Sequence, residues 1–154
     1  MPPPTRLTLE IVAPDRPIVR EQVDEVEIPG ETGYLGVLPG HTPLLASLKV
    51  GELWYRKGQE KSYIAIAFGF AEIQADRVTI LARYAEKAED LDLERAEEAR
   101  KRAEARLEKP TPDMDYERAR IALMKSLVRL QVASRVRIHS RGLKHPPGAS
   151  SDAS

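Results

Sequence analysis

The hydrophobic pattern of this chain changes its period once, between about Tyr84 and Asp90, and this change constrains the fold more than any other feature. Before it, apolar and polar residues alternate, which is typical of half-buried strands. After it, apolar residues recur every three to four positions, which is typical of amphipathic helices. The sequence therefore predicts a β domain over residues 1–85 followed by helices, within a chain of 154 residues.

The first 85 residues contain short segments with strand patterns. Alternation or β-rich composition marks residues 7–12, 25–28, 62–73 and 77–82. Turn signals separate the segments at Pro14-Asp15, Pro29-Gly30, Pro39-Gly40, Val50-Gly51, Lys57-Gly58 and Ala75-Asp76. Many short antiparallel strands with such punctuation favour a β-sandwich or a barrel.

The first expected helix has an unusually small apolar stripe. Asp90 or Asp92 can cap it, and Pro110 and Pro112 end it because proline lacks a backbone donor. Its stripe consists mostly of alanine: Leu93, Ala96, Ala99, Ala103 and Leu107. Alanine favours helix but removes little area from water, so the segment commits weakly to any core.

A second helix follows, beginning at Asp113 or Asp115, and the short connection favours an antiparallel two-helix hairpin over residues 86–138. Its apolar stripe runs through Tyr116, Ala119, Leu123, Leu127, Leu130 and Ala133. Two helices cannot enclose a core alone, so the hairpin must dock on the β domain, on a partner or on a ligand. Residues 139–154 are rich in Ser, Gly and Pro and are expected to form a disordered tail. The expected fold class is thus α+β, an N-terminal β-sandwich followed by a helical hairpin.

Charge is balanced overall but not along the chain. The 24 basic and 24 acidic residues cancel, which together with 5% aromatic residues argues against a nucleic-acid binder. No acid occurs between Glu117 and Asp152, a stretch that contains Arg118, Arg120, Lys125, Arg129, Arg135, Arg137, Arg141 and Lys144. The second helix therefore carries charge of one sign, suited to phosphates or to acidic protein segments.

Catalytic and metal-binding patterns are largely missing. The chain has no cysteine, which fits a reducing compartment, and His41, His139 and His145 lack metal-ligand spacing. The glycine-rich stretch from Gly30 to His41 lacks the GK[ST] signature of a phosphate loop, so its glycines are interpreted as turn residues. Neither a signal peptide nor a membrane-spanning segment is expected.

The joint order of these features resembles the epsilon subunit of bacterial F-type ATP synthase, called delta in mitochondria. "GYLGVLPGHTPLL" at 33–45 is similar to the family's G-x-L-G-x-x-P-G-H-x-P-L-L segment. "VDEVEIPGETG" before it, "GFAEIQADRVTIL" at 69–81 and "DLDLERAEEA" at the start of the helices are also similar to family patterns. The likeness covers about residues 5–138.

The resemblance implies a non-catalytic rotor subunit of the central stalk, on the cytoplasmic face of the bacterial plasma membrane. Such a subunit links the gamma subunit to the polar loops of the c-ring during proton-driven ATP synthesis. It further implies that the hairpin lies folded on the sandwich or extends along gamma toward the alpha and beta subunits, where it restrains ATP hydrolysis. No cofactor is required, and no metal or catalytic residue is implied.

The resemblance also implies candidate site residues. ATP is a possible regulatory ligand, through an [IL]-D-x-x-R-A motif and further contacts: Glu86, Leu91, Asp92, Arg95, Ala96, Arg102, Lys125 and Arg129. Lys125 stands where well-known binders carry arginine, and lysine loses the fork that holds phosphate. The contact loop for gamma and the c-ring would contain Glu31, Tyr34, Pro39 and His41. The inhibitory contact would use Arg118, Lys125, Arg129 and Arg135. An autonomous ATP-sensing module remains an alternative function.

Overall fold

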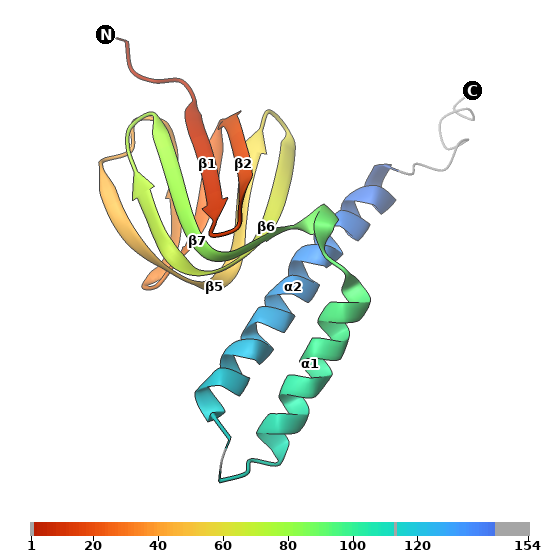
Figure 1. Ribbon diagram of the computed structural model, residues 1–154. Coiled ribbons are helices and arrows are strands. Elements are labelled where there is room, and N and C mark those ends of the chain that lie inside the picture. The colour runs from red at the N-terminus through yellow and green to blue at the C-terminus, as the bar shows by residue number, and fades with distance from the viewer. Residues whose placement is uncertain (1, 113, 144–154) are drawn as a thin grey trace, which may run out of the picture.

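The computed structural model of the chain describes residues 2–112 and 114–143, and it contains a β domain followed by a helical hairpin (Figure 1). The strands are β1 (Leu7–Ala13), β2 (Arg16–Val23), β3 (Glu25–Gly30), β4 (Gly33–Val37), β5 (Leu44–Lys57), β6 (Glu60–Ile73) and β7 (Arg77–Lys87). A 3₁₀ turn, η1 (Ala88–Asp90), leads into α1 (Leu93–Glu108) and α2 (Tyr116–Leu143). The predicted fold class is confirmed.

The seven strands form one sheet in the order β2-β1-β7-β6-β5-β3-β4. One hydrophobic cluster contains Val19 and Val23 from β2 together with Val26 and Val37 from β3 and β4. Because these strands lie toward opposite edges of the sheet, they can share a core only if the sheet folds over on itself. The domain is therefore a sandwich of two layers made from a single sheet.

The long strands β5, β6 and β7 pass from one layer to the other and exchange their buried face on the way. In β6, Ile64 and Ile66 are buried in the core before the crossing, whereas Ala71 and Ile73 are buried after it. The crossing lies at Phe68 and Gly69, whose φ angles are 61° and 127°. The positive φ at these two positions turns the strand over, and the register with β7 is the same on both sides of Phe68.

The structure contains three strands besides those identified by alternation. It also differs from the sequence prediction in the length of two strands and in the direction of one strand pair. β2, β4 and β5 lie between the segments with strand patterns, and β5 and β6 each have 14 residues rather than a few. Among the described strand pairs, β1 and β7 run parallel whereas the expected pairing was antiparallel throughout. A parallel pair arises here because β1 and β7 are joined through all the other strands rather than by a hairpin.

The two domain boundaries differ by a few residues from those expected at 85 and 138. β7 continues to Lys87 because Glu86 and Lys87 still pair with β6. α2 continues to Leu143, within the segment expected to be a disordered tail, and the first proline of that segment is Pro146. The remainder of the tail, residues 144–154, and the alternative cap Asp113 lie outside the described residues.

Both helices begin at the aspartates that lie closer to the helical stripe. Asp92 Oδ1 accepts hydrogen bonds from the backbone amides of Glu94 and Arg95 at 3.0 and 3.3 Å. Asp115 Oδ1 accepts one from the Arg118 amide at 3.1 Å. The caps satisfy amides that have no partner within the helix, so the alternatives left open by the sequence are decided in favour of these two residues.

Candidate functional site

The outer surface of one sandwich layer carries an acid–alanine–acid row across three strands, made by Glu52 of β5, Ala65 of β6 and Glu86 of β7. Glu52 lies directly opposite Ala65, and Ala65 directly opposite Glu86. Neighbouring strands are about 4.8 Å apart, so the two acids are separated by roughly 9.6 Å of sheet. We refer to these three residues as the acid row.

Helix α2 lies on the acid row and matches its spacing. Val132 is fully buried and packs with Ala65 and Ala88. Arg129 and Arg135 each stand three residues from Val132, about 60° to either side of it, and are separated by roughly 9 Å along the helix axis. One valine therefore sits over the central alanine, while an arginine reaches each acid.

The pair between Arg135 and Glu52 is the more complete of the two. Arg135 donates from Nε and Nη2 to the two carboxylate oxygens of Glu52, at 3.2 Å each. Glu52 is 7% exposed, so the carboxylate is nearly covered. The hydrogen bonds that Arg135 donates to Glu52 raise the pKa of Arg135 above its usual value, which keeps the guanidinium charged. Loss of either side chain should be destabilising, because the buried carboxylate of Glu52 and the bidentate guanidinium of Arg135 compensate each other's charge.

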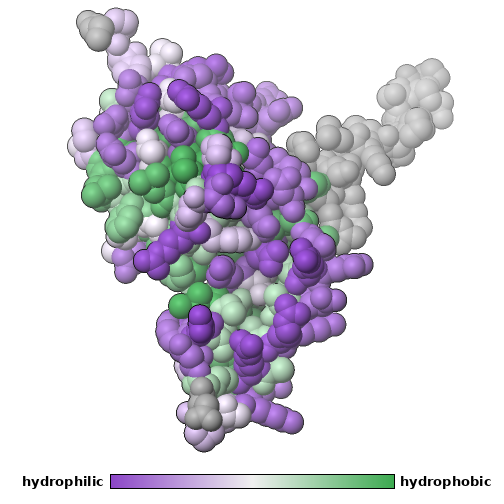
Figure 2. All heavy atoms as spheres, viewed as in Figure 1, coloured by the Kyte–Doolittle hydropathy of each residue, from purple (hydrophilic) through white to green (hydrophobic). Residues whose placement is uncertain are grey.

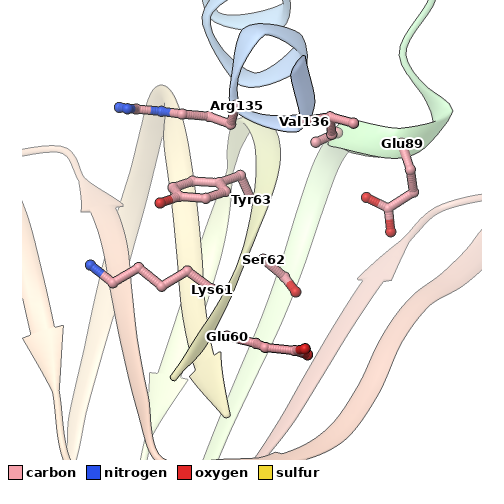
Figure 3. A pocket seen from close by; sticks show the side chains of 8 residues that line it. Glu60, Lys61, Ser62, Tyr63, Glu89, Arg135 and Val136 are labelled. Atoms are coloured by element: carbon pink, nitrogen blue, oxygen red, sulfur yellow. The ribbon is translucent and has the colours of Figure 1, made fainter. Parts of the chain in front are cut away.

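Arg135 also lines a pocket of about 280 Å³ beside the docking contact, and Figure 3 shows its guanidinium above the ring of Tyr63. The distance from Cζ to the ring centroid is 5.2 Å, within the range of a cation–π interaction. Lys61 and Arg135 extend to one side of the pocket, whereas Glu60 and Glu89 extend to the other. None of the eight candidate ATP residues lines this pocket.

The second pair is built around Tyr84, which sequence reasoning missed. Arg129 Nε donates to Glu86 Oε2 at 3.3 Å, the Tyr84 hydroxyl donates to the same oxygen, and Lys125 Nζ lies 4.7 Å from the Tyr84 ring centroid. Burial, reinforced by Glu86, raises the pKa of Tyr84 well above its usual range. The alternation of side chains along β7 could have indicated Tyr84, because Tyr84 and Glu86 are two residues apart and therefore lie on one face of the strand.

The structure brings together part of the predicted ATP set. Glu86, Lys125 and Arg129 meet at Tyr84, and Leu91 packs against the apolar cluster around Val132. Asp92 is the N-cap of α1, and its carboxylate accepts hydrogen bonds from the first backbone amides of that helix. Ala96 is fully buried, whereas Arg95 and Arg102 are exposed to solvent.

A groove between the two helices lies apart from the ATP set. It has a volume of about 390 Å³ and is lined by Leu93, Glu94, Glu97, Lys101 and Leu130. None of the eight candidate residues is among them. The described structure thus brings three of the eight candidates together in one cluster.

The four cations of the predicted inhibitory contact lie in two different places when the hairpin is docked. Lys125, Arg129 and Arg135 point onto the sandwich, where they meet Tyr84, Glu86 and Glu52. Arg118 lies instead at the far tip of the hairpin, exposed, beside a hollow that Arg106 and Lys109 also line. In this position of the hairpin, three of the four cations are therefore engaged by side chains of the sandwich.

The predicted contact loop is split between the two ends of β4. Glu31 and Tyr34 lie at its start, in and after the β3–β4 turn, whereas Pro39 and His41 follow its end. The strand between them spans roughly 16 Å at 3.3 Å per residue. Tyr34 is 51% exposed, with Lys49 Nζ 4.9 Å from its ring centroid, while the His41 ring Nδ1 lies 2.6 Å from the Thr42 carbonyl oxygen. The four residues therefore form two separate groups, at opposite ends of β4.

An exposed apolar patch lies on the outer face of the other layer and was not anticipated. Its members are Leu45 of β5, Phe70 of β6 and Leu81 of β7, which are 70%, 56% and 56% exposed. Phe70 and Leu81 face each other across the two strands and line a hollow of about 280 Å³ with Val12. Figure 2 shows apolar, green atoms gathered on part of the sandwich and purple, polar side chains along both helices. The patch depends on the face exchange of β6 and β7, because this exchange turns Phe70 and Leu81 toward solvent.

Two kinds of site are not found among the described residues. Among the side chains that the structure describes, in residues 2–112 and 114–136, no three histidine, cysteine or acidic groups are arranged as metal ligands. No helix within residues 2–112 and 114–143 combines the length and apolar composition that crossing a bilayer requires.

Comparison with known proteins agrees with this architecture. Residues 6–88 match the family model described as ATP synthase, Delta/Epsilon chain, beta-sandwich domain, and residues 89–134 match the one described as the long alpha-helix domain. A protein of Syntrophotalea carbinolica named ATP synthase epsilon chain 2 is 48% identical over 131 residues, which cover 84% of this chain and 95% of the relative.

Two solved structures share the fold at low sequence identity. A chain of the Euglena gracilis mitochondrial ATP synthase has a TM-score of 0.65 and 23% identity, covering 91% of this chain and 84% of its own. A chain of the Tetrahymena thermophila mitochondrial ATP synthase, in a structure of the central stalk and c-ring, has a TM-score of 0.51 and 12% identity, covering 88% and 98%. Together, the two-domain match to the family models and the 48% identical relative place this chain in the family of ATP synthase delta/epsilon chains, which are non-catalytic subunits of that complex.

Proposed function

We propose that this chain is a rotor subunit of the central stalk, which links the gamma subunit to the loops of the c-ring in proton-driven ATP synthesis. The exposed apolar patch carries this proposal, because three large apolar side chains on one outer face are typical of a surface that a partner covers. The two ends of β4 are the proposed contacts with the c-ring. Within a bacterial cell the subunit would lie at the cytoplasmic face of the plasma membrane, as a peripheral part of the complex.

Copurification with gamma tests the rotor role. Replacing Phe70 and Leu81 by serine should weaken the association with gamma strongly, since these two side chains lie at the centre of the patch. Leu127→Ser is a matched control, because Leu127 is 48% exposed but belongs to α2. Retention of full gamma binding by the patch variant would contradict the assignment of this face.

We further propose that the hairpin restrains ATP hydrolysis when it leaves the sandwich and contacts the alpha and beta subunits. The support is electrostatic: α2 carries cations without a following acid up to Leu143, and its docking rests on a small apolar contact. Deleting residues from 88 onward should raise the ATPase activity of the assembled complex. The variant with alanine at Lys125, Arg129 and Arg135 should weaken inhibition, and salt should do the same in the native complex. Unchanged activity after the deletion would remove the inhibitory role.

ATP binding by the hairpin is a second proposal, favoured by the cluster of Glu86, Lys125 and Arg129 and by the exposed Arg95 and Arg102. These two arginines are seven residues apart on α1 and therefore share a face. Titration calorimetry on the isolated chain tests binding, with Arg95→Ala as the control. Heat that disappears in the control supports an ATP-sensing module, whereas no heat at millimolar ATP means that the motif serves only the helix start.

A further inference from the structure

The pocket beside Tyr63 lies where three elements meet. The start of β6 forms one wall, η1 forms a second, and the α2 segment at Arg135 and Val136 forms the third. Its volume of about 280 Å³ corresponds to a space about 8 Å across, enough for a small molecule. Because the walls come from both domains, the complete pocket exists only while the hairpin is docked. ATP binding through the eight candidate residues would leave this pocket empty, since none of them lines it.

The charged side chains of the pocket are separated by sign (Figure 3). Lys61 and Arg135 extend to one side. Glu60 and Glu89 extend to the other side. The four formal charges cancel, so an ion of either sign would meet repulsion at one side of the pocket. A molecule that carries opposite charges at its two ends satisfies both sides.

Aromatic rings hold the two cations in place. Lys61 Nζ lies 4.1 Å from the ring centroid of Trp54, and Arg135 Cζ lies 5.2 Å from that of Tyr63. Trp54 and Tyr63 are directly opposite each other on β5 and β6. The hydrogen bonds from Arg135 to Glu52 use Nε and Nη2. Within the described residues, Nη1 of Arg135 and the ammonium group of Lys61 therefore remain as donors for a carboxylate.

The two acids of the pocket have no counter-charge of their own. Glu60 and Glu89 are both exposed, and neither forms an ion pair with another side chain that the structure describes. Lys61 follows Glu60 directly in β6, but consecutive strand residues point to opposite faces. Glu52 differs from both acids, because it is already neutralised by Arg135. The acidic side of the pocket is thus suited to an ammonium group.

We propose that this pocket binds a small zwitterion, with an ammonium group and a carboxylate at opposite ends of a short apolar chain. The ammonium group faces the two acids, the carboxylate faces the two cations, and the chain packs against Tyr63 and Val136. An ω-amino acid with four methylene groups separates its charges by roughly 6 Å, which fits the space available. Such binding is independent of the proposed rotor and inhibitory roles.

The probe is 5-aminopentanoate, titrated into the full chain. Pentylamine and pentanoate, which each lack one of the two charges, are the control ligands. Calorimetry measures affinity, and fluorescence of Trp54, the single tryptophan of the chain, reports on the pocket because Lys61 lies over its ring. The dissociation constant should be on the order of 1 mM, as expected of a ligand with so few atoms. Each control ligand should bind about threefold to fivefold more weakly.

Variants test the two sides of the pocket separately. Glu89→Gln should weaken 5-aminopentanoate binding by about threefold to fivefold and leave the affinity for pentanoate unchanged. Lys61→Gln should weaken it to a similar extent and leave the affinity for pentylamine unchanged. Asp90→Asn and Arg20→Gln are the matched controls, because both side chains are exposed and neither lines the pocket. Both control variants should bind as the native chain does.

Absence of heat and of a fluorescence change at about 20 mM 5-aminopentanoate would overturn the proposal. Equal affinity for the zwitterion and for pentylamine would also overturn it, because the cationic side would then have no part in binding. Weakening in Asp90→Asn as large as in Glu89→Gln would indicate a general effect of surface charge and would contradict the site. Circular dichroism of each variant excludes misfolding as the cause of any loss.

Discussion

At the scale of single residues, the sandwich depends on backbone conformations at one crossing point. Phe68 and Gly69 both have positive φ, and a Cβ on Gly69 would lie 2.0 Å from the Leu81 carbonyl oxygen. Phenylalanine tolerates such a φ only when the surrounding structure imposes it. The crossing is what allows β6 to contribute to both layers.

Gly69→Ala should therefore destabilise the domain by roughly 3 kcal/mol or more, since it combines a backbone clash with an unfavourable φ. Gly36→Ala is the matched control: a Cβ there meets nothing within 4 Å. It should change stability by less than about 1 kcal/mol, in the stabilising direction. Chemical denaturation of both variants measures the difference, and equal midpoints would refute the role given to the crossing.

Tyr84 should stay protonated in alkaline solution where exposed tyrosines ionise. Burial and Glu86 hold its folded-state pKa above the reference value of 10.0. The stability that this hydroxyl contributes is therefore fully present below about pH 10 and is lost only as pH rises through the folded-state pKa. In an absorbance titration, Tyr84→Phe should leave the tyrosinate signal between pH 9 and 11 nearly unchanged. A clear loss of that signal in Tyr84→Phe would show that Tyr84 is accessible to solvent.

At the scale of elements, α1 is held in place by its cap and by close packing rather than by a wide apolar stripe. Ala96 and Ala103 are its buried residues, and small side chains allow α1 and α2 to approach closely. Arg100 adds ion pairs with Glu97 and Glu104 on the same helix. Such a helix forms readily and remains only loosely attached to the sandwich, which suits a movable element.

Removal of the α1 cap tests this description. Asp92→Ala should cost about 1 kcal/mol of hairpin stability, because two backbone amides lose their acceptor. Asp90→Ala, at an exposed position in η1, should cost much less. Amide hydrogen exchange at the start of α1 reports the difference. Equal exchange in the two variants would mean that Asp92 does not act as a cap in solution.

Docking of α2 on the sandwich should depend on the size of the side chain at position 65. Ala65→Leu places three further carbon atoms where Val132 packs, so the hairpin should move away while helix content and the sandwich are retained. Ala65→Gly keeps the slot open and should leave the hairpin docked. Distances between spin labels on the two domains measure the change. A docked hairpin in the leucine variant would show that Val132 is not the central contact.

At the scale of the whole molecule, the two domains differ in how they are stabilised. The main core contains only sandwich residues, from Leu7 to Ala85, whereas the hairpin shares a small separate cluster with the sandwich. The sandwich therefore has what it needs to fold alone, and the hairpin does not. This asymmetry is what permits the hairpin to change position without loss of the fold.

A chain ending at Lys87 should consequently unfold in one cooperative thermal transition and keep its β-type circular dichroism. A fragment of residues 88–143 should show partial helicity that melts gradually, because two helices with an alanine interface bury too little area. Scanning calorimetry on both fragments checks this. A sharp transition in the hairpin fragment would contradict the dependence on docking.

Much of the architecture was determined by the sequence, since it follows from local chemistry. The change from alternation to helical spacing, the cap aspartates and the prolines at 110 and 112 specify a β domain and a hairpin without reference to distant residues. The family motif at 33–45 and the motif at 91–96 supplied the candidate residues. The end of β7 does not follow from local chemistry, because its last residues are held by pairing with β6.

The tertiary structure alone decided which face each residue occupies and which partner it meets. The face exchange leaves Leu81 exposed and Ala85 buried, although strict alternation would place both on one face of β7, and no periodicity count anticipates that reversal. Glu52 and Glu86 look like ordinary strand acids until Ala65 is placed between them and α2 is laid across the row. Sequence specifies local conformation through short-range interactions, whereas charge pairing between segments 83 and 43 residues apart exists only after the chain has closed on itself.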